Sequence, residues 1–305
     1  FRCPWELDGR SLALSRILLG FTVLVDLADR IWAGFYEHYT DVGSYPRSMY
    51  YGHASYYRQW FPSIYMIAGT FTPLCVLFAV HAVFALMFMV GYKTRLSNII
   101  LWYMTASLIV RNETMTHAGD SLLCVTLFWN IFIPNGELFS VDQALKGMFA
   151  VENGQPVTSV RKVNQARNVC CIGTFALLVQ VSLLYIASTI FKSRDASWTG
   201  GTALYYALST KYLTTWPSTL LRSSLSGPLC FVLTRSVVFG QFVCPLLLWV
   251  PIASLRSLLA LTGVALLLSM HVGIVLMMNI PVFFLVDLSQ LSAFLPGAFW
   301  QFVEQ

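Results

Sequence analysis

The chain has 305 residues, of which 57% are hydrophobic and only 11% are charged, and its mean hydropathy is +0.66. Soluble domains are about a quarter charged, so this composition excludes a soluble globular protein and indicates an integral membrane protein. The formal net charge of +5 is dispersed along the chain, which excludes the concentrated basic surface that nucleic-acid binding requires. We therefore expect a lipid bilayer as partner and no nucleic acid.

Apolar runs suited to bilayer spans, which take about 20 helical residues each, recur along the chain. The predicted spans are residues 12–32, 63–90, 97–110, 121–133, 169–191, 229–250 and 258–278, with a weaker segment at 280–286. The sequence thus predicts an all-α, multi-pass membrane protein with about seven spans, or six to eight. We expect one domain over 1–305, with extramembrane segments at 139–168 and 192–227, the latter carrying interfacial helices.

Charged residues inside the first span predict a polar face within the protein. Asp26 and Arg30 are four residues apart, so they can pair on one face of a helix. Intramembrane charges of this kind usually face a bundle interior or a cavity.

Sidedness follows from the alternation of spans. The polar segments 34–62, 111–120 and 192–227 fall on one face, and the N-terminal residues, Lys93, Arg95 and 139–168 fall on the other. Lys93 and Arg95, together with Arg161, Lys162 and Arg167 before the fifth span, favour placing the N-terminal face in the cytoplasm or its equivalent. The organelle stays open.

The seven cysteines show no metal-binding spacing, and an odd number does not suggest a disulfide framework. Most lie in apolar runs, where cysteine behaves as a small hydrophobe. We predict no metal site, and the redox compartment stays open.

Lys192 is the most informative polar residue, because it sits where the fifth apolar run ends and precedes Trp198 and Gly201. Such a lysine commonly snorkels to the lipid headgroups. It can also act as a base that takes a proton from a weak acid, with a nearby Arg or His stabilising the anion.

Other polar residues could join Lys192 in a site on that face. They are Arg111, Asn112, His117, Asp120, Asp195 and, deeper in the membrane, His271. Simpler roles remain open: Asp120 can cap the following helix or pair with Arg111, and Asp195 can be interfacial.

Six motifs, in order, cover nearly the whole chain. They are LSRILLGFTVLVDLADR (14–30), GYKTRLS (91–97), the RN…GD turn (111–120), FWNIFIPNGELFSVDQAL (128–145), FKSRDASWTGG (191–201) and a His271…Phe283 pair. This pattern resembles the HTTM domain, the membrane domain of vitamin K-dependent γ-carboxylase and its relatives. The Gly119-Asp120 turn is closer to the bacterial-type branch of that family.

The resemblance implies an HTTM-type helical bundle and a catalytic lysine. In the carboxylase, a lysine before an Asp-x-Trp…Gly segment deprotonates the reduced quinone. Lys192, Trp198 and Gly201 match that segment, and His271 matches a membrane histidine. One departure is that Gly119 stands where the carboxylase has a histidine, with His117 two residues away. The carboxylase also carries a large lumenal domain after its membrane region, whereas this sequence ends soon after.

Two functional hypotheses follow. The first is a carboxylase-like enzyme that uses a reduced, vitamin K-like quinone. Its catalytic residues would be Lys192, His117 and His271, and its cofactor-binding residues Arg111, Asn112, Asp120, Trp198 and Gly201. The alternative is a non-catalytic accessory or scaffold subunit of a larger membrane complex, holding lipid or quinone. An open cleft at Lys192 and His271 would favour the enzyme, and covered side chains the subunit.

Overall fold

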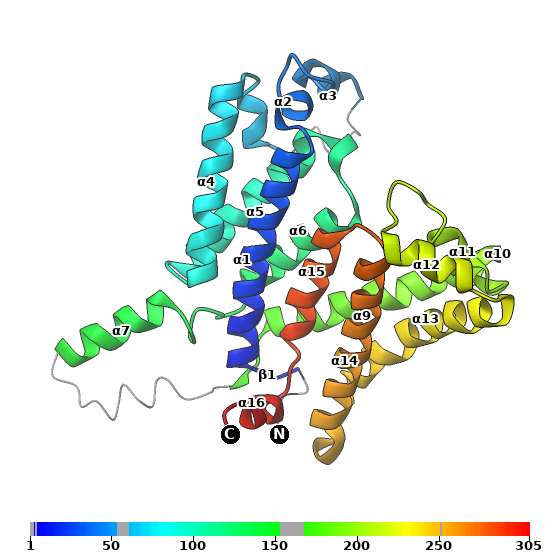
Figure 1. Ribbon diagram of the computed structural model, residues 1–305. Helices are drawn as coiled ribbons and strands as arrows, with labels where there is room; N and C mark the ends of the chain where they lie inside the picture. Colours follow the sequence, from blue (N-terminus) through cyan, green and yellow to red (C-terminus); the bar gives the residue numbers. More distant parts are fainter. Residues whose placement is uncertain (1–2, 4, 54–60, 153–167, 251) are drawn as a thin grey trace. The chain divides into compact units, whose positions relative to one another are not determined.

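In the computed structural model the described residues are helical apart from loops, one two-residue β ladder and an isolated β-bridge between Thr214 and Met278 (Figure 1). The structure describes residues 3, 5–53, 61–152, 168–250 and 252–305. These residues form fifteen α-helices. They divide into two compact units, of which unit 1 comprises Phe1–Ser11 with Asn168–Gln305 and unit 2 comprises Leu12–Arg167. The cations Arg161, Lys162 and Arg167 lie outside the described residues.

Unit 2 contains most of the first long helix and the helices that follow it in the chain, as far as α7. Its elements are α1 (Gly9–Trp32, whose first three residues belong to unit 1), α2 (Phe35–Tyr39), α3 (Arg47–His53), η2 (Ile64–Ile67), α4 (Phe71–Val90), α5 (Thr94–Arg111), η3 (Glu113–Met115), α6 (Ala118–Asn130) and α7 (Val141–Glu152).

Helix α5 is the interior helix of unit 2, packed against α4 and α6. It buries polar side chains such as Asn98 and Thr105. The Asn98 amide donates to the Leu127 carbonyl of α6 at 3.2 Å, and Thr105 lies 3.2 Å from Nε2 of His81 on α4. Polar groups in an apolar interior need such partners. The other ring nitrogen of His81 lies 3.0 Å from the Tyr65 hydroxyl, so this histidine serves packing.

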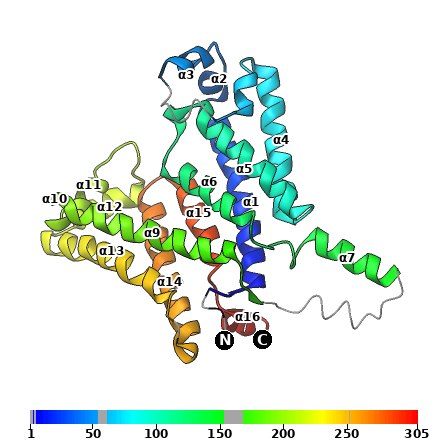
Figure 2. The same ribbon diagram turned by 180° about the vertical axis from the view of Figure 1, so that it is seen from behind.

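Unit 1 is built from segments at both ends of the chain. Its elements are β1 (Leu7–Asp8), β2 (Asn168–Val169), α9 (Ile172–Arg194), α10 (Ala196–Thr199), α11 (Ala203–Ala207), α12 (Trp216–Ser224), α13 (Gly227–Leu247), α14 (Ala253–Met277), α15 (Pro281–Ser292) and α16 (Gly297–Val303). Helix α13 packs against α9 and α14, and α14 against α15. The short helices α10 and α11 gather at the α13 end that adjoins the C-terminus of α9 (Figure 2).

Five described helices are long and apolar enough to span a membrane, or six if the bent pair α15–α16 forms one span. They are α1, α4, α9, α13 and α14. The expected spans at 97–110 and 121–133 correspond to α5 and α6, which do not qualify. Helix α6 has only 13 residues, about 20 Å of helix. Helix α5 is covered mainly by protein, so it need not be as apolar as a lipid-facing helix. The protein is thus a multi-pass helical membrane protein with five or six candidate spans among the described residues, at or below the lower end of the predicted six to eight.

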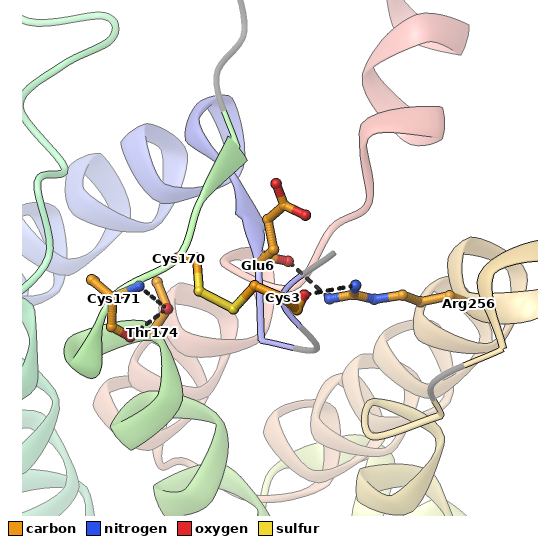
Figure 3. Close-up of a disulfide and its surroundings, with 6 residues drawn as sticks. All are labelled: Cys3, Glu6, Cys170, Cys171, Thr174 and Arg256. Atoms are coloured by element: carbon orange, nitrogen blue, oxygen red, sulfur yellow. Dashed lines mark hydrogen bonds between the residues drawn. A yellow bond between two sulfur atoms is a disulfide. The ribbon is translucent and has the colours of Figure 1, made fainter. Parts of the chain in front are cut away.

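The N-terminal strand is tied into unit 1 by a disulfide between Cys3 and Cys170, whose Cα atoms are 6.3 Å apart (Figure 3). Beside it, Leu7 pairs with Val169 in an antiparallel ladder. The Arg256 guanidinium of α14 donates to the carbonyls of Cys3 and Glu6 at 3.2 and 3.0 Å. The expectation of no disulfide framework is therefore wrong for this pair. A separation of 167 residues leaves no local spacing pattern to recognise.

The chain ends meet at the same end of unit 1. Arg10 forms an ion pair with Asp8 at 2.9 Å and another with Glu304 at 2.7 Å. The Trp300 indole N–H donates to Ser11 at 2.7 Å. These contacts and the disulfide attach the N-terminal residues to parts of unit 1 that lie far away in the sequence. We therefore expect loss of the disulfide to loosen the whole unit.

We predict that Cys3→Ser lowers the stability of unit 1, because the crosslink restricts the unfolded chain. Removing a native disulfide of this kind costs about 2–4 kcal/mol. Thermal unfolding in mild detergent, followed by circular dichroism, should show a lower midpoint. Reductant should lower the wild-type midpoint and leave that of the variant unchanged. Cys75→Ser, in unit 2, is the control, and equal midpoints for all three proteins would contradict the prediction.

Candidate functional site

Polar side chains form a row along one face of α9 in unit 1. Ser182, Tyr185, Ser188 and Lys192 recur every three or four residues, which places them on one side of the helix. Their side-chain partners come from α13, α14 and α15 and, for Ser182, from Trp249 just after α13. Ser182 and Tyr185 are buried, and Ser188 and Lys192 are partly buried, so the row faces the other helices of the unit.

Lys192 is held at the C-terminal end of this row by neutral groups. Its ammonium donates to Ser188 Oγ and to Gln241 Oε1 of α13, both at 2.6 Å, and lies 4.9 Å from the centre of the Trp198 ring. Since Ser188 is one turn earlier on α9, the lysine side chain turns back along the span, not outward to headgroups. No ion pair found among the described residues includes Lys192.

The segment after α9 positions Trp198 over the lysine. Asp195 caps α10 by accepting hydrogen bonds from the Ser197 hydroxyl and from the N–H groups of Ser197 and Trp198, which hold the pKa of this carboxyl below its ordinary value. Gly201 has a φ of +74°, and a Cβ there would lie 2.8 Å from Cα of Phe231 on α13. The structure thus explains Asp195 and Gly201 by local geometry, and only Trp198 contacts the lysine.

Farther into the same row, Tyr185, His271 and Asp287 form a buried cluster. The Tyr185 hydroxyl lies 2.9 Å from His271 Nε2 and donates to Asp287 Oδ1 at 3.3 Å. His271 Nδ1 and Asp287 Oδ2 are also 3.3 Å apart, but they are not aligned as a hydrogen bond. Both side chains are only 2% exposed.

The number of protons that the cluster holds depends on which way the Tyr185 hydroxyl donates. If Tyr185 donates to Asp287, its oxygen accepts the Nε2 proton of His271, and the Nδ1 lone pair then faces the second carboxylate oxygen. Two acceptors at this distance repel each other unless one of them carries a proton. The cluster can therefore hold a proton on either His271 or Asp287.

In unit 2, Arg30 is the centre of a buried ion cluster. It pairs with Asp26 at 2.9 Å and with Asp120 at 2.6 Å, and donates to the Tyr39 hydroxyl at 2.8 Å. The expected Asp26–Arg30 pair is confirmed. Asp120 also caps α6 through the His117 N–H at 2.7 Å, while Nδ1 of the half-exposed His117 accepts from Gly119 N–H at 3.1 Å.

Arg111 and Asn112 attach the end of α2 and the segment after it to the end of α5. Arg111 donates to the carbonyls of Tyr39 and Tyr45 at 2.6 and 2.9 Å, and Asn112 donates to that of His38 at 2.7 Å. In this segment, hydrogen bonds from Arg47 hold the pKa of Asp41 below its ordinary value. Asp120 thus caps a helix and pairs with Arg30, and Arg111 and Asn112 bind backbone.

The predicted site residues therefore fall into two groups. Lys192 and Trp198 come together in unit 1, where His271 belongs to the same polar row. The turn residues Arg111, Asn112, His117 and Asp120 come together in unit 2. Sequence reasoning did not single out Tyr185, Ser188, Gln241 or Asp287. The first two could have been found from their spacing to Lys192, and Gln241 as a polar residue in an apolar helix.

Among the described residues, no group of three or more His, Cys, Asp and Glu side chains is arranged to hold a metal ion. Comparison of the chain with protein-family models, curated proteins and solved structures gives no match.

We predict that Arg30→Gln strongly destabilises unit 2, because it leaves two buried carboxylates without their counter-charge. Breaking a buried ion pair by removing one partner costs about 3–5 kcal/mol. Thermal unfolding in detergent should show a large fall in midpoint. Arg95→Gln, at an exposed position of α5, is the matched control. A change no larger than that of the control would show that the cluster contributes little.

Proposed function

We propose that this chain is an HTTM-like membrane protein in which Lys192 takes a proton from a weakly acidic, lipid-soluble substrate. By resemblance to γ-carboxylase, that substrate class is a reduced quinone. The observation that carries the proposal is the setting of Lys192, with its ammonium turned back into the span and hydrogen-bonded only to the neutral Ser188 and Gln241.

The chemistry follows from charge. Because no described carboxylate pairs with Lys192, the lysine can lose its proton without leaving a buried carboxylate unpaired. The neutral amine can then accept the hydroxyl proton of a quinol, and the resulting ammonium pairs with the anion that forms. Ser188 and Gln241 orient the amine, and the Trp198 face stabilises the ammonium through a cation–π contact.

The Tyr185–His271–Asp287 cluster supplies a second place for a proton in the same unit. Tyr185 is seven residues before Lys192 on α9, about 10 Å along the helix axis. In this proposal His271 is a proton holder inside the protein and not a group that touches substrate, since it is almost fully buried.

The alternative is a non-catalytic subunit of a larger membrane complex that holds lipid or quinone. Three observations favour it: Arg111 and Asn112 are engaged with backbone carbonyls, Asp120 is engaged with Arg30, and His271 is covered by its neighbours. Native electrophoresis of the protein extracted in mild detergent distinguishes the two hypotheses. Stable co-migration with other membrane proteins supports the subunit.

We predict that Lys192→Met reduces quinol deprotonation by at least about 100-fold, the usual contribution of a general base. The assay uses protein in liposomes with vitamin K1 hydroquinone and follows aerobic quinol oxidation by absorbance. Lys192→Arg should be equally defective, because the guanidinium stays protonated. Lys211→Met, at an exposed position of the same unit, should match the wild type. Wild-type rates equal to those of empty liposomes, or of Lys192→Met, would refute the proposal.

A further inference from the structure

Helix α7 of unit 2 begins beside the end of the α4 span, and its first residues are hydrogen-bonded there. Asp142 accepts hydrogen bonds from the N–H groups of Lys93 and Thr94, at 2.7 and 2.8 Å, and from the Thr94 hydroxyl at 2.7 Å. In return, the Asp142 N–H donates to the carbonyl of Gly91, the residue that ends α4, at 2.9 Å. The start of α7 is therefore fixed at the boundary between α4 and α5.

A buried arginine supports the turn before α7. Arg16 of α1 donates to the carbonyls of Asn135, Leu138 and Phe139 at 2.7, 3.3 and 2.5 Å. Phe139 has a φ of +48°, a left-handed conformation that is unfavourable for a residue with a side chain. Yet this strained position leaves the Phe139 ring 59% exposed. The protein thus holds an aromatic ring away from its own core.

One face of α7 is apolar and lines a groove against the end of α4. Val141, Ala144, Met148 and Val151 follow the three-and-four spacing of a single helix face. With Val90 and Phe139 they line a cavity of about 1050 Å³. Met148 is 68% exposed, whereas Lys146 projects from a different face of the helix. In both views of the unit, α7 runs sideways from the ends of α4 and α5 (Figures 1 and 2).

We propose that α7 lies in the membrane interface and that its groove holds an acyl chain of a bilayer phospholipid. The groove is continuous with the exposed Val90 at the end of the α4 span, so lipid that coats α4 can extend into it. An amphipathic helix fixed at a span boundary buries its apolar face among acyl chains and keeps its polar face in water. This places the first part of the 139–168 segment on the membrane, where sequence reasoning expected an extramembrane segment.

Photo-crosslinking tests this site. Two variants, Met148→p-benzoylphenylalanine and Lys146→p-benzoylphenylalanine, are reconstituted separately in phosphatidylcholine vesicles and irradiated. The mass of each protein is then measured by mass spectrometry to detect adducts. Val83→p-benzoylphenylalanine, at an exposed position of the α4 span, is the positive control. We expect phospholipid adducts at 148 and 83, and at least tenfold fewer at 146.

Three results would overturn the proposal. A dimer adduct at 148 would indicate that a second copy of the chain fills the groove, and an intramolecular adduct at 148 would indicate that another part of the same chain does. Phospholipid adducts at 83 without adducts at 148 would show that lipid does not enter the groove.

The disulfide carries a second, independent inference, about sidedness. Cys3 precedes α1, and Cys170 lies two residues before the start of α9, so the bond lies near the start of both spans. Disulfides persist in oxidising compartments and are rare in the cytosol. We infer that this face of unit 1 lies in an oxidising compartment, opposite to the placement predicted from the cations. Helix α9 is about 35 Å long, so Lys192 then lies toward the reducing side.

Thiol labelling in bacterial spheroplasts tests the sidedness. The cells are treated with or without the membrane-impermeant reductant TCEP and then with a maleimide-polyethylene glycol that stays outside. We expect two additional labels on the wild type after TCEP and none on Cys3→Ser/Cys170→Ser. Additional labels that appear only in inverted vesicles, or two labels on untreated protein, would overturn the inference.

Discussion

A polar side chain inside a membrane protein must find its partners within the protein, because the bilayer core offers none. Most of the organisation of this chain depends on that constraint. Arg16 donates to three backbone carbonyls, Arg30 pairs with two carboxylates and a phenol, and Lys192 donates to a serine and a glutamine. Each of these cations has at least one partner outside its own helix, in the same unit, so its hydrogen bonds also help to set the packing.

The two units satisfy this constraint in different ways. In unit 2, the charge of Arg30 is opposed by Asp26 and Asp120, and Asp120 also sits at the N-terminus of α6, where a negative charge is stabilised. The terminal nitrogens of Arg111 donate hydrogen bonds to the backbone carbonyls of Tyr39 and Tyr45. These groups are committed to the fold and have little capacity left for chemistry. The cost of losing one is a cost in stability.

In unit 1, the polar groups along α9 are not neutralised by opposite charges in the same way. Lys192 has neutral partners, and if Tyr185 donates to Asp287, the facing acceptors of His271 and Asp287 need a proton between them. Lys192 and Tyr185, which contacts both His271 and Asp287, lie on one face of α9. This contrast is why we place the proposed chemistry in unit 1, although half of the residues that the family resemblance suggested lie in unit 2.

The sequence by itself determined the membrane class, the helical fold, the bounds of most of the long helices to within a few residues and the Asp26–Arg30 pair. These follow from composition and from spacing along one helix. Only the tertiary structure decided the partners of Lys192, the Tyr185–His271–Asp287 cluster, the Cys3–Cys170 bond and the interior position of α5. Each of these depends on residues from helices or strands that are distant in the sequence. Helical periodicity indicates on which face of its own helix a side chain lies, but it does not indicate which other helix that face contacts.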